Sequence, residues 1–342
     1  MVEIWALTFP AAGRGVSSAL AAEKQGWDGI YIADSQNLTS DVYVTLTAAA
    51  LETHRIRLGT GVTNPVTRHA AVTASAIASV NDVSAGRAVL GIGRGDSAVA
   101  HVGQAMASVA RFERYIRDVQ AYLAGEVVSI GEFASRIQWI DPIPGGKPLV
   151  DAAVTGPRAI AAAARSADRV SLTLGASPSR IRWGIEVARR AREEAGLDPD
   201  GLQIGAYVNC VAHPDRAAGK NLIRGSMGTL IRFSGMHPAN ATHLSGRQAA
   251  QLAELSRIYS VNQHAMRSAT HSAALDDELI DDLAIVGSSE YCLERLAELV
   301  QEGLRSLVVA GHSRDADPAI LEETSQRFAE EVLPHLRSLN PS

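Results

Sequence analysis

The feature that most constrains the fold is the regular alternation of short apolar runs with longer helical patterns. An apolar run at residues 2–9 precedes a helical pattern at 16–25, and a second apolar run follows at 29–34. Short apolar runs bounded by turn residues predict strands, whereas apolar residues at three- and four-residue spacing predict amphipathic helices. The chain therefore begins as a strand, helix, strand unit.

The same alternation continues and predicts eight strands. We expect them at residues 2–9, 29–34, 55–63, 87–93, 149–154, 169–174, 202–212 and 306–310. Strands separated by helices pair in parallel, because a parallel crossover needs about a dozen residues. Eight parallel strands can close into a (β/α)8 TIM barrel, an α/β fold whose chemistry collects at the C-terminal ends of the strands. A doubly wound open sheet is the alternative, which the strand count and the lack of a nucleotide-binding fingerprint after the first strand disfavour.

One long block interrupts this rhythm before the last strand. Residues 216–274 carry helical patterning without a convincing strand, and a long elaborated loop in a compact domain is usually functional. We expect a helical insertion at about 216–280 that covers the barrel mouth, within a single domain spanning 1–342. A second irregular stretch, 127–140, is expected to form a hairpin.

Charge and cysteine content limit the partners. The net charge of −5 gives no long-range attraction to nucleic acid or anionic lipid, so we expect a small-molecule partner. Cys210 and Cys292 lie far apart and outside any CxxC spacing, which predicts neither a disulfide framework nor a metal site. The chain has no uninterrupted apolar stretch of about 18 residues, and we expect a cytoplasmic protein.

Polar residues follow the second predicted strand, where a barrel would place its chemistry. Asp34, Ser35 and Gln36 stand there in sequence. A carboxylate at a strand end is a candidate for acid–base chemistry, and the alternative is that it orients a loop by accepting backbone hydrogen bonds. Both interpretations place Asp34 at the barrel mouth.

Two later loops have the composition of an anion-binding helix start. The residues Thr155, Gly156 and Pro157 open one predicted helix, and Gly175, Ala176 and Ser177 come before the next. Small residues there leave free N–H groups and the positive end of the helix dipole for a phosphate. The alternative is that they only cap their helices.

The loop after the fourth predicted strand also contains glycines. Gly93 and Gly95 flank Arg94, and glycines permit close approach of the backbone to a ligand. The alternative is a tight turn in which Arg94 pairs with a carboxylate such as Asp96 or Glu113. The histidines of the helical block match no metal spacing and face either substrate or solvent; they are His237, His243, His264 and His271.

Two segments carry a resemblance to a known family. Residues 55–69 read RIRLGTGVTNPVTRH, and residues 90–98 read LGIGRGDSA. Both resemble the luciferase-like flavin- and deazaflavin-dependent oxidoreductase superfamily, and within it the methylenetetrahydromethanopterin reductase-like branch. The resemblance is strong over residues 1–110, fair over 150–200, and slight over 216–280.

This resemblance implies a (β/α)8 barrel, a cis peptide at Gly61-Val62 beneath the cofactor ring, and phosphate binding by the two later loops. The expected cofactor-binding residues are Thr60, Gly61, Val62, Asn64, Gly93, Arg94, Gly95, Thr155, Gly156, Gly175, Ala176 and Ser177. Asp34 matches the acidic position of the family. Several deazaflavin enzymes have histidine at the next position, where this chain has Ser35. Either Ser35, Gln36 or a histidine of the helical block takes over the proton transfer, or the reaction needs no strong general acid.

The resemblance also implies an activity. We expect a hydride to be exchanged between coenzyme F420 and a small organic substrate. One alternative is an FMN-dependent monooxygenase that uses O2, and another is a flavin-binding barrel without turnover. Barrels of this group usually pair, so we expect a homodimer or higher homo-oligomer, with the apolar helices near 41–51 and 70–77 at a two-fold interface.

Overall fold

The computed structural model describes residues 1–9, 14–140, 143 and 145–339. Eight parallel strands form a closed barrel with the order β9, β11, β1, β2, β3, β4, β7, β8, and β8 pairs again with β9. The strands are β1 (Glu3–Thr8), β2 (Gly29–Ile32), β3 (Arg57–Thr60), β4 (Ala88–Ile92), β7 (Leu149–Val154), β8 (Arg169–Leu172), β9 (Gln203–Ala212) and β11 (Ser306–Ala310). The prediction of a (β/α)8 barrel is confirmed, and the open-sheet alternative is wrong.

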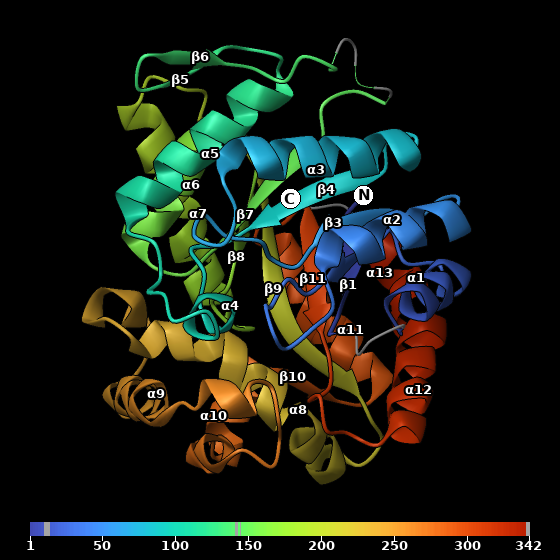
Figure 1. Cartoon of the computed structure of the whole chain (residues 1–342). Coiled ribbons are helices and arrows are strands. Elements are labelled where there is room, and N and C mark those ends of the chain that lie inside the picture. Colours follow the sequence, from blue (N-terminus) through green and yellow to red (C-terminus); the bar gives the residue numbers. More distant parts are fainter. Residues whose placement is uncertain (10–13, 141–142, 144, 340–342) are drawn as a thin grey trace.

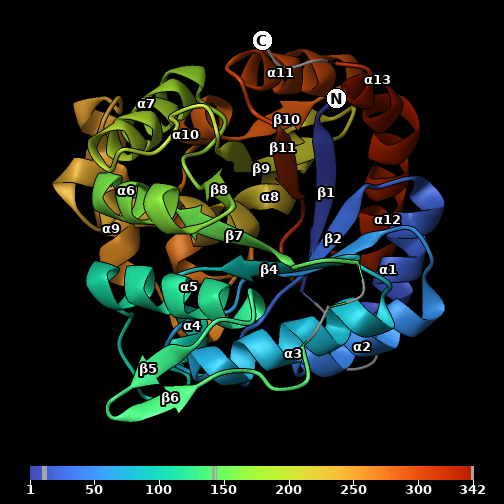
Figure 2. The same cartoon turned by 90° about the horizontal axis from the view of Figure 1, so that it is seen from above.

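Helices surround the barrel in the alternating order that the sequence predicts (Figures 1 and 2). They are α1 (Arg14–Gln25), α2 (Val42–Glu52), α3 (Ala70–Val83), α4 (Ser97–Ala100), α5 (Val109–Leu123), α6 (Pro157–Ser166), α7 (Pro178–Glu194), α11 (Ser289–Gln301), α12 (Pro318–Arg327) and α13 (Leu333–Arg337). Local sequence fixes several helix starts: the carboxylate of Asp41 accepts from two N–H groups at the start of α2, and the hydroxyl of Ser108 caps α5. The helix predicted over 318–336 is interrupted by one π-helical turn between α12 and α13.

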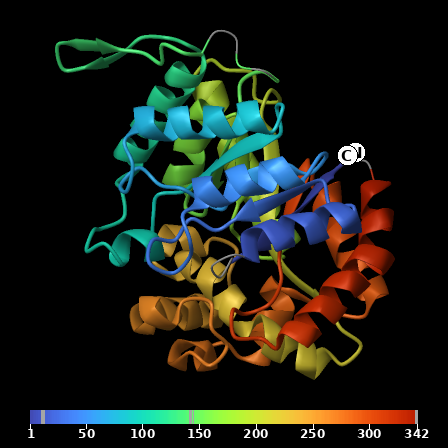
Figure 3. The ribbon, with the colours of Figure 1, turned by 45° about the vertical axis from the view of Figure 1, so that its right-hand side comes forward.

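The helical insertion follows β9. It contains α8 (Arg216–Ile231), α9 (Gly246–Ile258) and α10 (Asp277–Leu283), with short 3-10 turns between them. These helices gather at one end of the barrel, opposite the hairpin of β5 (Val128–Ile130) and β6 (Phe133–Ser135) (Figures 1 and 3). The hairpin expected within 127–140 is confirmed. That the insertion and the barrel make one domain remains a prediction.

One short strand was not predicted. β10 (Ile285–Gly287) follows α10 and extends the sheet beside the end of β9. Its three residues are too few to give an alternating pattern, and it pairs only with the last residues of the ten-residue strand β9. Because β10 follows the insertion directly, it ties the C-terminal end of the insertion to the barrel.

The interior of the barrel is filled by large side chains. Trp5 stacks on Tyr31 with ring centroids 4.7 Å apart, and glycines make room for both rings: a Cβ on Gly29 would lie 2.3 Å from the Trp5 ring, and one on Gly59 would lie 2.5 Å from the Tyr31 ring. A filled interior is typical of this fold and leaves space for ligands only at the mouth.

An ion pair that the sequence did not reveal lies among these rings. Arg169 Nε lies 3.0 Å from the carboxylate of Asp151, and both side chains are almost fully buried. Tyr31 donates its hydroxyl hydrogen to Asp151 at 2.5 Å. Burial alone would lower the pKa of Arg169, but Asp151, Tyr31 and Glu3 together outweigh burial and raise it. Arg169 therefore keeps its positive charge inside the barrel, where it joins β8 to β7 through Asp151.

Candidate active site

A cavity of about 610 Å³ lies at the C-terminal mouth, between the strand ends and the insertion. Most of the residues predicted to bind cofactor or take part in catalysis line it: Asp34, Ser35, Gly61, Val62, Asn64, Gly93, Arg94, Gly95, Thr155 and Gly156. The other predicted residues are not part of the lining: Gln36, Thr60, Gly175, Ala176 and Ser177. The structure thus brings together the loops after β2, β3, β4 and β7, whereas the loop after β8 contributes only Thr173 and not its three predicted residues.

The chain leaves the barrel ladder after β3. The peptide between Gly61 and Val62 is cis, as the resemblance implied. Gly61 and Val62 form a bulge next to β3. Thr60, the last residue of β3, is buried in the barrel wall, where its hydroxyl donates to the carbonyl of Gly91 at 2.7 Å and anchors the chain just before the bulge. A Cβ on Gly61 would lie 2.9 Å from Leu7 and from Tyr31, and the site therefore requires glycine.

Asn64 follows this bulge and has an unused donor. Its side-chain oxygen accepts from the N–H groups of Val66 at 2.9 Å and Thr67 at 3.0 Å. Its Nδ2 is buried and has no hydrogen-bond partner. A buried polar group without a partner is unfavourable, so Asn64 has a donor available for an acceptor atom of a ligand in the cavity.

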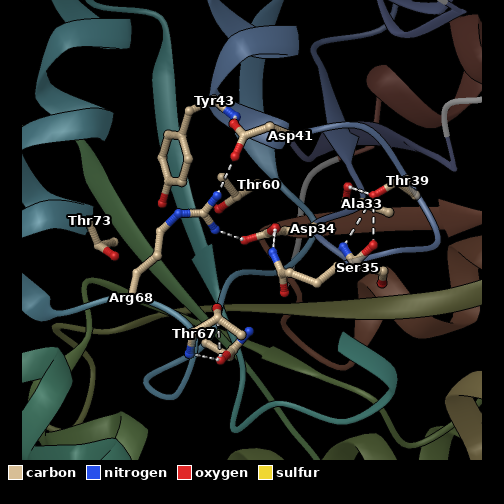
Figure 4. Close-up of polar contacts among 12 residues, drawn as sticks. Ala33, Asp34, Ser35, Thr39, Asp41, Tyr43, Thr60, Thr67, Arg68 and Thr73 are labelled. Atoms are coloured by element: carbon tan, nitrogen blue, oxygen red, sulfur yellow. Dashed lines mark hydrogen bonds and ion pairs between the residues drawn. The ribbon is translucent and has the colours of Figure 1, made fainter. Parts of the chain in front are cut away.

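Asp34 lies in a polar cluster at the edge of the cavity (Figure 4). Its carboxylate lies 3.0 Å from Arg68 Nη1 and accepts from Gln36 Nε2 at 2.7 Å. Arg68 also pairs with Asp41 at 2.6 Å and stacks over the ring of Tyr43. Burial raises the pKa of Asp34, and the charge of Arg68 offsets this only in part. A buried carboxyl with a raised pKa in a cavity is suited to taking up and releasing a proton.

Ser35 and Gln36 occupy different positions beside Asp34. Ser35 lines the cavity and is buried, and its main chain is held by the hydroxyl of Thr39. Gln36 points to Asp34 and acts on the cavity only through that carboxylate. Gln36 is thus a positioning residue for Asp34.

Arg94 does not make the ion pair considered for it. Its Nε donates to the carbonyl of Ala107 at 2.8 Å. Of the two carboxylates considered, Asp96 pairs with Arg232, and Glu113 pairs with arginines on α5 and α6. The alternative in which Arg94 is neutralised by a neighbouring carboxylate is wrong, because both carboxylates are occupied.

A second arginine, Arg158 in the first turn of α6, faces the same cavity. Burial, and after it the charge of Arg158, lowers the pKa of Arg94. Within the described part of the chain, neither side chain forms an ion pair with a carboxylate. Two cations that repel each other at one cavity wall favour an anionic ligand there. Arg158 was not among the residues predicted to bind the cofactor, although it lies two positions after Gly156 of the predicted anion-binding loop.

The loop after β7 also lies against the insertion. Gly156 is the N-cap of α6, with Pro157 in the first turn. A Cβ on Gly156 would lie 2.3 Å from Oδ1 of Asn240, a residue of the insertion that also lines the cavity. Glycine at this position lets the insertion approach the anion-binding loop.

The loop after β8 is packed elsewhere. Ala176 is fully buried, and its N–H donates to the carbonyl of Leu283 at 2.8 Å. A Cβ on Gly175 would lie 2.9 Å from the same oxygen. Ser177 caps no N–H group with its side chain and instead bonds to Ser179 at the surface. In this structure, Gly175 and Ala176 contact the end of the insertion, and none of the three residues lines the cavity, so a phosphate role for them stays a prediction.

The insertion contributes one wall of the cavity, which the sequence did not assign by residue. These side chains come from α8 and the turns after it: Thr229, Leu230, Phe233, Met236, His237, Ala239, Asn240 and His264. Of the four histidines considered, His237 and His264 line the cavity, His271 is buried outside it, and His243 is exposed. In the sequence, the one sign of a site in this block was its high content of histidine. That content does not tell which of the four histidines line the cavity.

In the ranges that the structure describes, no three His, Cys, Asp or Glu side chains come together as a metal site. No helix among these residues is long and apolar enough to cross a membrane.

A parallel barrel with a large, partly covered cavity at its C-terminal mouth has the architecture of a barrel enzyme. The model of the luciferase-like monooxygenase family matches residues 5–306, and the chain belongs to this family. It is an oxidoreductase of the luciferase-like class, a family that contains both reductases and monooxygenases.

Known relatives cover nearly the whole chain. A 5,10-methylenetetrahydromethanopterin reductase of Methanolobus tindarius is 29% identical over 301 residues, which are 85% of this chain and 87% of the relative. The coenzyme F420-dependent tetrahydromethanopterin reductase of Methanopyrus kandleri has a similar structure, with a TM-score of 0.77, 21% identity, and coverage of 98% and 99% of the two chains. A Baeyer-Villiger monooxygenase component of Pseudomonas putida in complex with FMN has a TM-score of 0.67 at 18% identity, with 99% of each chain covered.

Proposed function

We propose that this chain is a deazaflavin-dependent oxidoreductase that exchanges a hydride between coenzyme F420 and a small organic substrate. The observation that carries the proposal is that one cavity joins an unpaired amide donor, two arginines without carboxylate partners, and a buried carboxyl with a raised pKa. The relatives named for F420-dependent reduction support the deazaflavin over FMN.

The residues present fit such a cofactor. A deazaflavin has ring carbonyl and nitrogen acceptors, which suit the unpaired Nδ2 of Asn64. Its phosphate is an anion, which suits Arg94, Arg158 and the helix start at Gly156. The bulge at Gly61 and Val62 presents an apolar surface on which a flat ring can lie. When bound, the deazaflavin supplies or takes up the hydride.

The protein's own residues then bind, orient and exclude water. Asp34 holds or releases the proton that accompanies hydride exchange, at the oxygen atoms that Gln36 and Arg68 position. Leu7 and Tyr207 give the cavity an apolar and aromatic floor. The insertion covers the mouth, and exclusion of water strengthens electrostatic interactions inside.

The test is hydride exchange followed through the cofactor itself. The full chain is mixed with oxidised F420 and a panel of alcohols, and separately with reduced F420 and the matching carbonyl compounds. We expect loss or recovery of deazaflavin absorbance with at least one pair, and a much slower rate for Asp34→Asn. Consumption of O2 with reduced FMN, together with no exchange in any F420 reaction, would contradict the proposal and favour the monooxygenase.

The proposal extends to assembly and location. We propose a homodimer of a cytoplasmic protein, with the outer faces of α2 and α3 at the two-fold interface. Val44 and Leu51 on α2 and Val72 on α3 are well exposed apolar side chains, between 57% and 71% accessible. Light scattering in solution tests this, and a monomeric mass at micromolar concentration would contradict it.

A further inference from the structure

A chain of hydrogen bonds inside the insertion ends at the cavity on His264. It begins at the carbonyl oxygen of Gly225, which lies 3.1 Å from the hydroxyl of Thr229. Thr229 Oγ1 lies 3.0 Å from the hydroxyl of Tyr259, and this hydroxyl lies 2.9 Å from Nδ1 of His264. Thr229, Tyr259 and His264, which we call the relay, are all largely buried, and Thr229 and His264 line the cavity.

The relay has a direction, because its first member can only accept. The carbonyl of Gly225 has no hydrogen, so Thr229 donates to it. Each hydroxyl has a single hydrogen, which leaves Tyr259 as the donor to Thr229. The oxygen of Tyr259 then accepts from Nδ1 of His264, and Nδ1 must carry the hydrogen.

Burial and the positive charges around His264 keep its ring neutral. Burial first, and then the charges of Arg232 and Arg314 and the nearby His101 and His271, lower the pKa of His264 to about 3. These groups lie around the ring on the barrel loops and the insertion, together with Tyr259, whose hydroxyl bonds to Nδ1. A neutral imidazole with hydrogen on Nδ1 has a bare lone pair on Nε2.

We propose that Nε2 of His264 is a hydrogen-bond acceptor for the substrate, so that the cavity selects substrates carrying a hydroxyl or N–H donor apart from the carbon that exchanges the hydride. Nδ1 is occupied by Tyr259, and the described residues offer no partner for Nε2. This assignment rests on the proposed function only in taking the cavity as the substrate site. A site with a fixed acceptor discriminates strongly against a ligand that lacks the donor.

Two other histidines of the insertion have the opposite arrangement. Nδ1 of His237 accepts from the N–H of Ala239 at 3.1 Å, and Nδ1 of His271 accepts from the N–H of Ser260 at 3.3 Å. In the neutral ring, both therefore carry hydrogen on Nε2. They are matched references for His264 within the same molecule.

The first experiment reads the tautomer directly. The full chain, labelled with 15N-histidine and free of cofactor, is examined by long-range 1H–15N correlation, and His264→Gln assigns the resonances. We expect a protonated Nδ1 and a bare Nε2 for His264, with the reverse pattern for His237 and His271. A protonated Nε2 on His264 would overturn the proposal.

The variant Thr229→Val tests whether the relay determines the tautomer of His264. Thr229→Val removes the acceptor of the Tyr259 hydrogen, and Tyr259 can then donate to Nδ1. We expect the hydrogen of His264 to move to Nε2 in this variant, whereas His243→Gln on the exposed surface leaves the pattern unchanged. An unchanged tautomer in a folded Thr229→Val variant would contradict the relay. If the variant does not fold, the spectrum of the unaltered chain still decides the tautomer.

The second experiment tests recognition with phenol and anisole, which differ by the hydroxyl hydrogen and one methyl group. We expect phenol to shift the Nε2 resonance of His264, and anisole to bind about tenfold more weakly without this shift, as one neutral hydrogen bond predicts. Equal effects of the two compounds, or none from either, would overturn the recognition. Neither experiment needs F420 or turnover, so failure of the proposed hydride transfer is seen separately, in the exchange assay.

Discussion

Arg232 in the insertion pairs with Asp96 in the loop after β4, 136 residues away along the chain. The guanidinium also lies 3.8 Å from the ring centroid of Tyr259. Arg232 is 4% exposed, whereas the side chain of Asp96 is 21% exposed at the cavity, so this pair is partly shielded from solvent and from salt. The insertion is thereby held to the barrel at the cavity through a specific charged contact as well as through apolar packing.

Arg232→Met should loosen this attachment. Removing one partner of a shielded ion pair leaves the other charge uncompensated, and we expect a loss on the order of 3 kcal/mol of stability. Hydrogen exchange should become faster over residues 216–280 than over the barrel strands. Arg247→Met is the matched control, because Arg247 pairs with Asp276 and Glu278 at the surface. Its loss of stability should be much smaller than that of Arg232→Met, since water and salt screen a surface ion pair. Equal losses in the two variants would contradict a special role for Arg232.

Asp34→Asn should separate stability from turnover. Because burial raises the pKa of Asp34 on folding, the folded state binds this proton more tightly than the unfolded chain does. The contribution of Asp34 to stability therefore falls as the pH rises from its ordinary pKa of 3.8 through the raised value. The asparagine side chain does not titrate in this pH range, so the variant lacks this dependence of stability on pH.

We thus expect the free energy of unfolding of the unaltered chain, relative to Asp34→Asn, to be greatest at acid pH and to decline toward neutral pH. Turnover of the variant should fall by about 100-fold or more. Denaturant unfolding between pH 4 and pH 8 measures the first effect. A difference that grows with pH would show that the folded-state pKa is lowered, contrary to this account.

The barrel could be predicted from the sequence because each of its strands is short, apolar and followed by a helix. Parallel strands buried on both faces, such as β4 and β11, give the continuous apolar runs that the analysis used. β10 was missed because three residues form no pattern. The Arg169 and Asp151 pair also had no local signal, since it depends on side chains from β7 and β8 meeting inside the closed barrel.

Residues of the candidate site could be predicted only where they follow the C-terminal end of a strand or begin the next helix. Asp34, Asn64, Arg94 and Gly156 were found in this way, and all four line the cavity. The wall formed by the insertion was not assigned, because its partners lie 100 or more residues away, as for Arg232. The segment that begins at Gly175 has the sequence of a phosphate-binding loop. Its contact with Leu283 could not be predicted, because the two lie more than 100 residues apart in the chain.

Gly156→Ala should affect both folding and cofactor binding. The added Cβ would lie 2.3 Å from Asn240 Oδ1, and such overpacking typically costs about 1–3 kcal/mol. We also expect weaker F420 binding, measured by fluorescence titration. The double variant with Asn240→Ala should recover most of the stability, because the clashing oxygen is gone. Unchanged stability in Gly156→Ala alone would contradict the observed packing.

Arg158→Gln should weaken cofactor binding without weakening the free protein. Arg158 is exposed and repels Arg94, so its loss should change stability by no more than about 0.5 kcal/mol. F420 affinity should fall about tenfold and should depend less steeply on salt. Arg190→Gln on α7 is the control, since Arg190 is exposed and outside the cavity lining. The same loss of affinity in both variants would argue against an anion site at Arg158.

The central claim is that the cavity binds a deazaflavin. Its most direct test is titration of the cofactor-free protein with F420 and, separately, with FMN, following the fluorescence of each ligand. This account predicts saturable, tight binding of F420 and much weaker binding of FMN. Tight binding of FMN alone, or of neither compound, would contradict it.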